Sequence, residues 1–485
     1  MQAARLLLPA LRWDERTGFD HERPRMDIAI ARGVGGFVLF GGEAGAVYEL
    51  TESLRTRCAH PLLIAADLER GAGQQFRGAT GLPPLAALGA LDDLATTRQA
   101  AALTAREALA LGVNWVLGPD SDLDLEPDNP IIGTRSFGAD PVRVAAHVTA
   151  WIEGCQSEGA LCCAKHFPGH GRTTTDSHAV LPAVTASRKE LERDLTPFRA
   201  AVLAGTDAVM TAHVAFPAID PSNAPATLSQ PIVDGLLRNE IGFDGLVATD
   251  AFNMRGVLDG DRTEGEAGVA AIAAGCDLLL YPPDIATMAD ALEAALGAAL
   301  PRARVARSIG RLNSAAARVG AEHGDGMVGR ATDLAWANSL AARCVKLLHG
   351  RVPVERSFDM VTLDDDLGGP FPAPSRDVFP RALRDAGLDP RESDQGASAS
   401  RPVLVAVYAD IRAWKGRPGL SVDAKARIAS IVKSRPDCTV LLFGHPRLAA
   451  EFAAPNVVVA WGGEAVMQRA AARFLADESA PPPAA

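Results

Sequence analysis

The densest group of chemically active side chains in the sequence lies between Lys165 and His178. This segment reads Lys-His-Phe-Pro-Gly-His-Gly-Arg-Thr-Thr-Thr-Asp-Ser-His, and it follows an apolar run that is typical of a buried strand. Its glycines, proline and polar residues predict a long loop. Three histidines, an aspartate, a lysine and an arginine are unusual in one loop, so we expect this loop to carry chemistry.

Two kinds of site fit this loop. In the first, the Asp176 carboxylate orients the His178 imidazole, and such a pair is a general acid/base that works near neutral pH. The second is a metal site built from His166, His170, Asp176 and His178. Metal-dependent barrel hydrolases usually draw ligands from several strand ends, so we favour the acid/base pair and expect no metal. A purely structural alternative is that Asp176 caps a turn and His178 is merely exposed.

A second candidate is Asp250, in the run Gly245-Leu-Val-Ala-Thr-Asp-Ala-Phe-Asn-Met254. An aspartate directly after a buried strand often caps the next helix. Opposite a proton donor, however, its carboxylate can attack an anomeric carbon. One group that donates a proton and another that attacks, on either side of one bond, form the arrangement of a retaining glycosidase.

The elements that must position these residues repeat along the first two-thirds of the chain, as an amphipathic helix, a glycine and a short apolar run. Most runs are continuous rather than alternating, which indicates parallel strands covered on both faces. The eight predicted strands are Leu6–Leu11, Gly36–Phe40, Leu62–Ala66, Val113–Leu117, Ala160–Ala164, Ala208–Met210, Leu246–Ala248 and Cys276–Leu280.

Eight such units predict a TIM-type (β/α)8 barrel. A doubly wound open sheet is the alternative, but its glycine-rich phosphate loop is missing, because Gly33–Gly36 precedes a strand. Active sites of barrels lie at the carboxyl ends of the strands. Several predicted strands deliver polar residues to that rim, namely Asp67, Asp120, Lys165, His166, His213 and Asp250.

The remaining sequence predicts a smaller α/β layered domain, and the whole chain is therefore of the α/β class. We place the barrel at residues 1–325, a linker at 326–345, the second domain at 346–478 and a disordered Pro/Ala-rich tail at 479–485. The second domain has predicted strands at Asp359–Thr362, Val403–Val407, Thr439–Leu442 and Val457–Ala460, with helices near 422–434 and 463–476.

Charge and composition argue against several classes of binding partner. The formal net charge of −11 and the lack of Lys/Arg-rich blocks argue against nucleic acid or an anionic membrane as a partner. No apolar run is long enough to span a bilayer. We interpret Leu6–Leu11 as a barrel strand rather than a truncated signal peptide. The seven scattered cysteines suggest neither zinc nor a disulfide framework. We therefore expect a cytoplasmic protein with a neutral or small polar substrate and no cofactor.

These motifs resemble those of glycoside hydrolase family 3, and within it the bacterial β-N-acetylglucosaminidases of peptidoglycan turnover. The resemblance covers roughly residues 5–320. It rests on Lys165–Gly171 with Asp176-Ser177-His178, on Asn129–Phe137 and on Asp250–Met254. One stretch, Asp67–Phe76, departs from the subgroup, which usually has a Glu-Gly-Gly-like run and an arginine before the aromatic residue.

The resemblance implies roles for the matched residues. Asp250 would be the nucleophile, His178 the acid/base and Asp176 its orienting partner. Sugar hydroxyls would be held by Asp67, Arg135, Lys165 and His166, while Met210 and His213 would line the same pocket.

The leading hypothesis is a retaining exo-β-N-acetylglucosaminidase that acts on peptidoglycan fragments. A β-glycosidase of broader specificity and a phosphorylase are alternatives, because a histidine donor would not repel an incoming phosphate. A sugar-binding protein without activity is a further alternative, which the presence of Asp250, Asp176 and His178 argues against.

Overall fold

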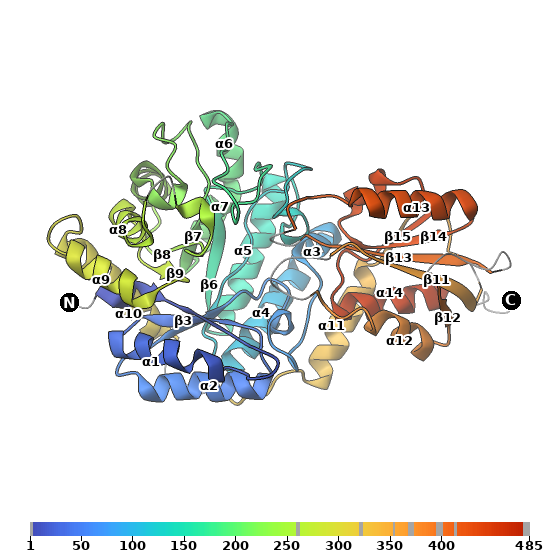
Figure 1. The fold of residues 1–485 in the computed structure, drawn as a ribbon, viewed down its shortest axis with the longest axis horizontal. Helices are drawn as coiled ribbons and strands as arrows, with labels where there is room; N and C mark the ends of the chain where they lie inside the picture. Colours follow the sequence, from blue (N-terminus) through green and yellow to red (C-terminus); the bar gives the residue numbers. More distant parts are fainter. Residues whose placement is uncertain are drawn as a thin grey trace. The chain divides into compact units, whose positions relative to one another are not determined.

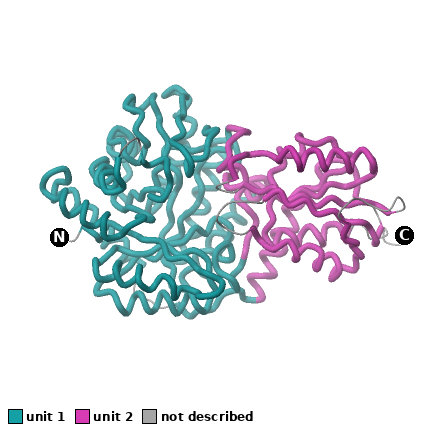
Figure 2. Tube along the Cα trace, in the orientation of Figure 1, with its two compact units in different colours: residues 1–80, 93–125, 138–330 teal, residues 81–92, 126–137, 331–485 magenta. Residues whose placement is uncertain are grey.

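In the computed structural model, the described residues are 3–258, 262–319, 324–352, 355–366, 373–393, 401–411 and 415–478. The chain forms two compact units (Figure 2). The first comprises Met1–Thr80, Asp93–Leu125 and Gly138–Arg330, and the second comprises Gly81–Asp92, Glu126–Phe137 and Ala331–Ala485.

The second unit therefore includes two short segments from the part of the sequence predicted as the barrel, Gly81–Asp92 and Glu126–Phe137. The sequence did not indicate this feature. Residues 326–345, predicted as a linker, include helix α11 (Ala331–Cys344). The tail predicted at 479–485 lies outside the described residues.

The first unit is a parallel sheet that curls into a barrel (Figure 1). Its seven-stranded part has the order β2-β3-β4-β5-β6-β7-β8, and a parallel pair, β1 and β9, closes it. The strands are β1 (Leu7–Leu8), β2 (Ala10–Arg12), β3 (Gly36–Phe40), β4 (Leu63–Ala66), β5 (Trp115–Val116), β6 (Leu161–Phe167), β7 (Ala208–Thr211), β8 (Leu246–Thr249) and β9 (Leu279–Leu280).

The first predicted strand, Leu6–Leu11, is divided at Pro9 into β1 and β2, because proline has no N–H to donate to a ladder. A bridge between Ala248 and Leu278 links the end of the seven-stranded part to the segment that leads into β9. The predicted barrel is therefore confirmed, with small shifts at the strand ends.

Alternate residues of the barrel strands form one apolar cluster. Leu63 with Ala65, and Leu161 with Cys163, are examples, and the pattern follows from the two-residue period of a strand. Burial of this cluster fixes which side chains face inward. The surrounding helices are α1 (Arg23–Arg32), α2 (Ala44–Arg57), α4 (Leu94–Ala110), α5 (Pro141–Ser157), α6 (Arg188–Asp194), α7 (Thr196–Leu203), the π-helix η6 (Pro231–Glu240), α8 (Glu264–Ala274), α9 (Ile285–Ala295) and α10 (Arg302–Arg318).

Two helix starts follow from their local sequence. Ser187 and Glu190 form a complete capping box at α6. The Asp140 side chain accepts the backbone amides of Val142 and Arg143 at the start of α5.

The second unit contains a six-stranded sheet of order β10-β15-β14-β13-β11-β12, in which β10 is antiparallel to its neighbour and the other pairs are parallel. Its strands are β10 (Lys346–His349), β11 (Ser357–Asp364), β12 (Asp389–Glu392), β13 (Val403–Ala409), β14 (Thr439–Gly444) and β15 (Asn456–Val459). Its helices are α3 (Leu85–Leu91), α11, α12 (Val378–Asp385), α13 (Val422–Ser434) and α14 (Ala465–Glu478).

The four strands predicted for the second unit correspond to β11, β13, β14 and β15, and the two predicted helices correspond to α13 and α14. The strands β10 and β12 were not predicted. Both lie at sheet edges, and neither has the apolar run on which the prediction depends: every residue of β10 is exposed, and β12 is mostly charged.

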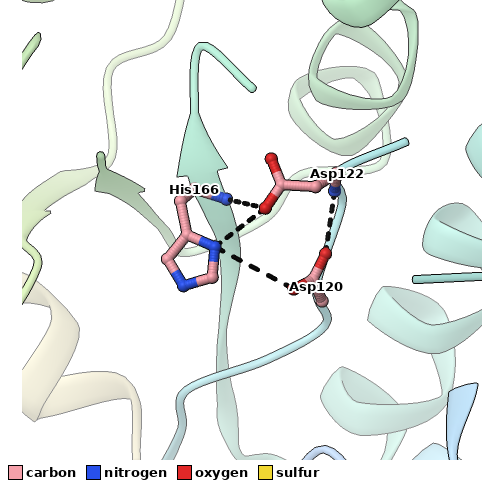
Figure 3. A group of neighbouring side chains, drawn as sticks. All are labelled: Asp120, Asp122 and His166. Carbon is pink, nitrogen blue, oxygen red and sulfur yellow. Dashed lines mark hydrogen bonds and ion pairs between the residues drawn. The ribbon is translucent and has the colours of Figure 1, made fainter. Parts of the chain in front are cut away.

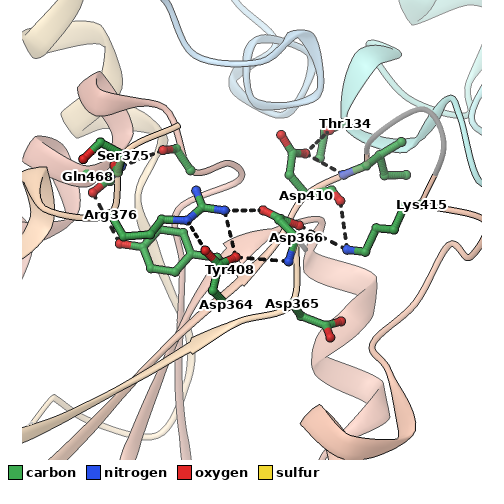
Figure 4. Close-up of polar contacts among 12 residues, drawn as sticks. Thr134, Asp364, Asp365, Asp366, Ser375, Arg376, Tyr408, Asp410, Lys415 and Gln468 are labelled. Carbon is green, nitrogen blue, oxygen red and sulfur yellow. Dashed lines mark hydrogen bonds and ion pairs between the residues drawn. The ribbon is translucent and has the colours of Figure 1, made fainter. Parts of the chain in front are cut away.

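Charged side chains cluster at the carboxyl ends of β11 and β13 (Figure 4). Arg376 donates to Asp364 and Asp366, and the Lys415 ammonium lies 3.1 Å from Asp366.

Among the described residues, the structure contains no helix both long and apolar enough to cross a membrane.

Candidate active site

The carboxyl ends of β4 and β6 are joined by a buried ion-pair cluster. The Lys165 ammonium, near the end of β6, donates to Oδ1 of Asp67 and lies near Oε1 of Glu69, both at 2.7 Å. The side chains of Lys165 and Glu69 are 2% and 4% exposed, whereas that of Asp67 is 27% exposed. Asp67 therefore has a fixed position and still offers its carboxylate to a ligand.

His166, the next residue of β6, faces two aspartates that follow β5 (Figure 3). Its Nδ1 lies 2.8 Å from Oδ2 of Asp122 and 3.9 Å from Oδ2 of Asp120, and its backbone N–H donates to the same Asp122 oxygen. All three side chains are buried. Asp122 thus binds Nδ1 and fixes the orientation of the His166 ring.

The atoms of Asp120, Asp122 and His166 that could bind a metal ion lie within 4.8 Å of one another. Over the described ranges this is the one group of three or more such residues, and it differs from the metal set considered from the sequence. In that set, both ring nitrogens of His170 are already engaged, by Thr173 and Ser177.

His170 anchors the long loop from inside. Its backbone N–H donates to Oδ1 of Asp122 at 2.6 Å, and its Nε2 lies 3.0 Å from the hydroxyl of Ser177, the residue before His178. Burial lowers the pKa of His170 to about 4, although the Asp122 charge opposes the shift. The ring is therefore neutral at pH 7 and acts as a fixed support for the loop.

Asp176 and His178 form the predicted pair. Oδ1 of Asp176 lies 2.7 Å from Nδ1 of His178 and accepts the His178 backbone N–H at 2.8 Å. Because an ionised carboxylate only accepts hydrogen bonds, Nδ1 is assigned the proton in the neutral ring. The His178 side chain is 20% exposed, against 7% for Asp176, so the imidazole is partly accessible and its carboxylate partner is sheltered.

Asp250 follows β8 directly. Its backbone N–H donates to the Thr211 carbonyl of β7, and its Oδ1 accepts the Ala251 amide at 2.7 Å. Burial alone would raise the pKa of its carboxyl, but the electrostatic influence of His166, His213 and His178 outweighs burial and lowers the pKa to about 2. Asp250 is therefore an anion at working pH and has three histidines close to it.

Two backbone hydrogen bonds tie the loop of His178 to the loop of Asp250. The amides of Arg255 and Gly256 donate to the carbonyls of His178 and Ser177, respectively. A side chain at Gly256 would place its Cβ 2.8 Å from the Ser177 carbonyl oxygen, so a glycine is required for this close approach. The two residues predicted to act on one bond are thus held by loops that pack on each other.

Met210 lies on β7, and His213 follows that strand. His213 is fully buried between the Thr227 hydroxyl and the Ala251 carbonyl, at 2.8 and 3.1 Å. Burial lowers its pKa, with the charge of Asp250 opposing the shift. Met210 belongs to the apolar cluster inside the barrel.

Arg135 lies in the segment that groups with the second unit. In the preceding residue, the Thr134 hydroxyl donates to Oδ1 of Asp410 at 2.8 Å (Figure 4). Gly133 is equally constrained, since a Cβ there would lie 2.1 Å from the Ile411 side chain. The contacts of the second unit therefore determine the backbone that carries Arg135.

Sequence reasoning missed three supporting residues. Glu69 binds Lys165, and the Tyr281 hydroxyl donates to Asp67. Asp122 binds both His166 and His170. Glu69 and Asp122 each stand two residues after an acidic residue already noted at a strand end, which was the available signal. No sequence pattern indicated Tyr281, whose backbone has a φ of +55° in the structure.

Comparison with known proteins identifies the family of the first unit. The N-terminal domain of glycosyl hydrolase family 3 matches residues 21–315. A β-hexosaminidase of Nitrosomonas eutropha is 38% identical over 262 residues, which cover 52% of this chain and 74% of that protein. A protein of Cellulomonas fimi named β-N-acetylglucosaminidase/β-glucosidase is 36% identical over 262 residues, 46% of its length. The chain therefore matches less than half of the latter protein.

A solved structure extends the similarity to both units. The family 3 β-N-acetylglucosaminidase of Paenibacillus sp. str. FPU-7 has a TM-score of 0.86 and 30% sequence identity, with 99% of this chain and 96% of that chain covered.

Proposed function

Because the chain belongs to glycoside hydrolase family 3 and is a glycoside hydrolase, we propose that it is a retaining exo-β-N-acetylglucosaminidase. The Asp176–His178 pair, tied to the loop of the ionised Asp250, carries this proposal. The names of the similar β-hexosaminidases support the choice of sugar.

In the first step, the Asp250 carboxylate attacks the anomeric carbon while His178 gives a proton to the leaving oxygen. This forms a glycosyl ester on Asp250 and releases the aglycone as an alcohol. In the second step, His178 takes a proton from water, and the water oxygen attacks the anomeric carbon. The ester bond breaks, Asp250 is again a carboxylate and His178 is protonated for the next cycle.

Asp176 supports both steps through Nδ1. Its carboxylate stabilises the imidazolium form, and in this mechanism Nε2 is the atom that exchanges the proton with the leaving oxygen. The low pKa of Asp250 suits a nucleophile that must be ionised while its neighbour is protonated.

We assign sugar binding to the remaining candidates. At the ends of β4 and β6, one acceptor comes from Asp67 and two donors come from Lys165 and His166. Arg135 adds a guanidinium. Met210 and His213 are assigned to the lining of the same pocket. Each polar group lost from such a pocket leaves a sugar hydroxyl without its partner, which costs about 1–3 kcal/mol.

The natural substrate that we propose is a peptidoglycan fragment with a terminal β-linked GlcNAc. The reaction needs no cofactor and no nucleic-acid or membrane partner. The seven cysteines all have free thiols, which is compatible with the cytoplasmic setting that we propose.

A turnover panel tests the proposal. We expect kcat/KM for p-nitrophenyl β-GlcNAc to exceed that for the β-glucoside on the order of a hundredfold, because a pocket built around an acetamido group leaves polar groups unpaired with glucose. GlcNAc-MurNAc and chitobiose, each with and without phosphate, complete the panel. Equal rates on the two aryl glycosides would favour a broader β-glycosidase, and a sugar phosphate product would favour a phosphorylase.

A further inference from the structure

We propose that Tyr281 is a positioning residue, which holds the Asp67 carboxylate in the orientation that receives the sugar. This inference rests on the proposed role of Asp67 as a sugar ligand. Tyr281 lies just after β9, the last strand of the barrel, and was not among the residues predicted from the sequence.

The Asp67 carboxylate is held from two sides. The Lys165 ammonium donates to Oδ1 at 2.7 Å, and the Tyr281 hydroxyl donates to Oδ2 at 3.2 Å. A carboxylate oxygen accepts about two hydrogen bonds, so each oxygen keeps a lone pair for a substrate hydroxyl. Two donors of the protein thus prevent rotation of a group that is still 27% exposed.

Two contacts hold Tyr281 itself. Its backbone N–H donates to the Leu8 carbonyl across the seam where the barrel closes, and its ring lies 5.1 Å from the Phe40 ring. Its φ of +55° is in the left-handed region, which a residue with a bulky side chain rarely adopts. Such a conformation persists where surrounding contacts enforce it, and it is enriched at functional sites.

The hydroxyl can only act as a donor toward Asp67. Burial, followed by the charge of Asp67, raises the pKa of Tyr281 well above its ordinary value, so the phenol stays protonated at any working pH. The contact is therefore a donation from the phenol to Oδ2 of Asp67. A sugar hydroxyl that also donates to the Asp67 carboxylate is favoured at this position.

The alternative is that the hydroxyl merely fills space near Asp67. A phenylalanine would keep the ring against Phe40 and the backbone bond to Leu8, and it would remove only the bond to Asp67. Replacement of Tyr281 by phenylalanine therefore separates the two explanations.

The test is a double-mutant cycle with Tyr281→Phe, Asp67→Ala and the double variant, measured on the aryl glycoside that the wild type cleaves best. We expect Tyr281→Phe to raise KM about tenfold, with kcat changed less than twofold, as for one lost hydrogen bond to a charged group. In the Asp67→Ala background, the same change should have no further effect.

Tyr408→Phe is a matched control, because it removes a buried hydroxyl bonded to Gln468 in the second unit and should leave KM unchanged. An unchanged KM in Tyr281→Phe, or an equal effect with and without Asp67, would overturn the inference. The cycle can be run on any glycoside that is cleaved, so a wild type that prefers the β-glucoside would contradict the proposed function and leave this test intact.

Discussion

Oδ1 of Asp176 accepts two hydrogen bonds from the same residue: the backbone N–H of His178 at 2.8 Å, and Nδ1 of its ring at 2.7 Å. The first bond sets the path of the chain, and the second sets the orientation of the ring. A side chain two residues away in the sequence thus fixes both, in a loop that has no strand or helix of its own between Phe167 and Arg188.

If Asp176 orients His178, its replacement should damage proton transfer without abolishing it. We expect Asp176→Asn to lower kcat about ten- to a hundredfold on substrates with poor leaving groups, because an amide does not stabilise the imidazolium form. Thr174→Ala, at an exposed position of the same loop, is the control. Steady-state rates equal to those of the wild type would show that the pair has no catalytic role.

Asp250→Asn should fold and lose nearly all turnover, because a carboxamide cannot form the glycosyl ester. Asp244→Asn, at a carboxylate that is 92% exposed, is the matched control. A 5-fluoro sugar should leave a covalent adduct on Asp250 of the wild type, which mass spectrometry of peptides can locate. A label on another carboxylate would assign the nucleophile elsewhere.

His170 should make stability depend on pH. Its pKa is about 4 in the folded state and near 6.5 in the unfolded chain. As the pH falls from 6.5 to 4, His170 becomes protonated in the unfolded chain but stays neutral in the folded state. The free energy of unfolding should therefore decrease by roughly 3 kcal/mol over this range, and no further below it.

Urea unfolding of the wild type and His170→Asn at pH 4, 5, 6 and 7 isolates this contribution from the other titrating groups. The variant should lose less stability between pH 6.5 and 4 than the wild type. The same pH dependence in both proteins would mean that His170 is not the group responsible.

Chelation should not change activity. His166 and His170 already engage Asp122 through three hydrogen bonds, and the mechanism needs no Lewis acid. Rates measured before and after extended dialysis against EDTA should agree. Activity that disappears in EDTA and returns with zinc would instead make Asp120, Asp122 and His166 a metal centre.

Much of the barrel could be predicted because continuous apolar runs and glycine stops report burial and chain reversal directly. The second unit was harder, since β10 and β12 are polar edge strands with no such signal. The association of Glu126–Phe137 with the second unit depends on single contacts such as that between Thr134 and Asp410, which no local pattern encodes.

The site shows the same limit. Asp67, Lys165, His178 and Asp250 were predicted as site residues because they are ionisable residues at strand ends or in an unusual loop. Tyr281 was missed because its contact with Asp67 depends on closure of the barrel. Closure places the last strand beside the first, and the Tyr281 hydroxyl then donates to Asp67. Proximity of this kind appears only when the strands are assembled.

The dependence of rate on the acidity of the leaving group tests the central claim, that His178 is the proton donor. The series would use aryl β-GlcNAc glycosides of graded phenol pKa, compared in wild type and His178→Ala. We predict a steep dependence in the variant, with poor leaving groups slowed on the order of a thousandfold and highly activated ones slowed little, since activated phenolates depart without a proton. Equal losses across the whole series would show that His178 is not the acid.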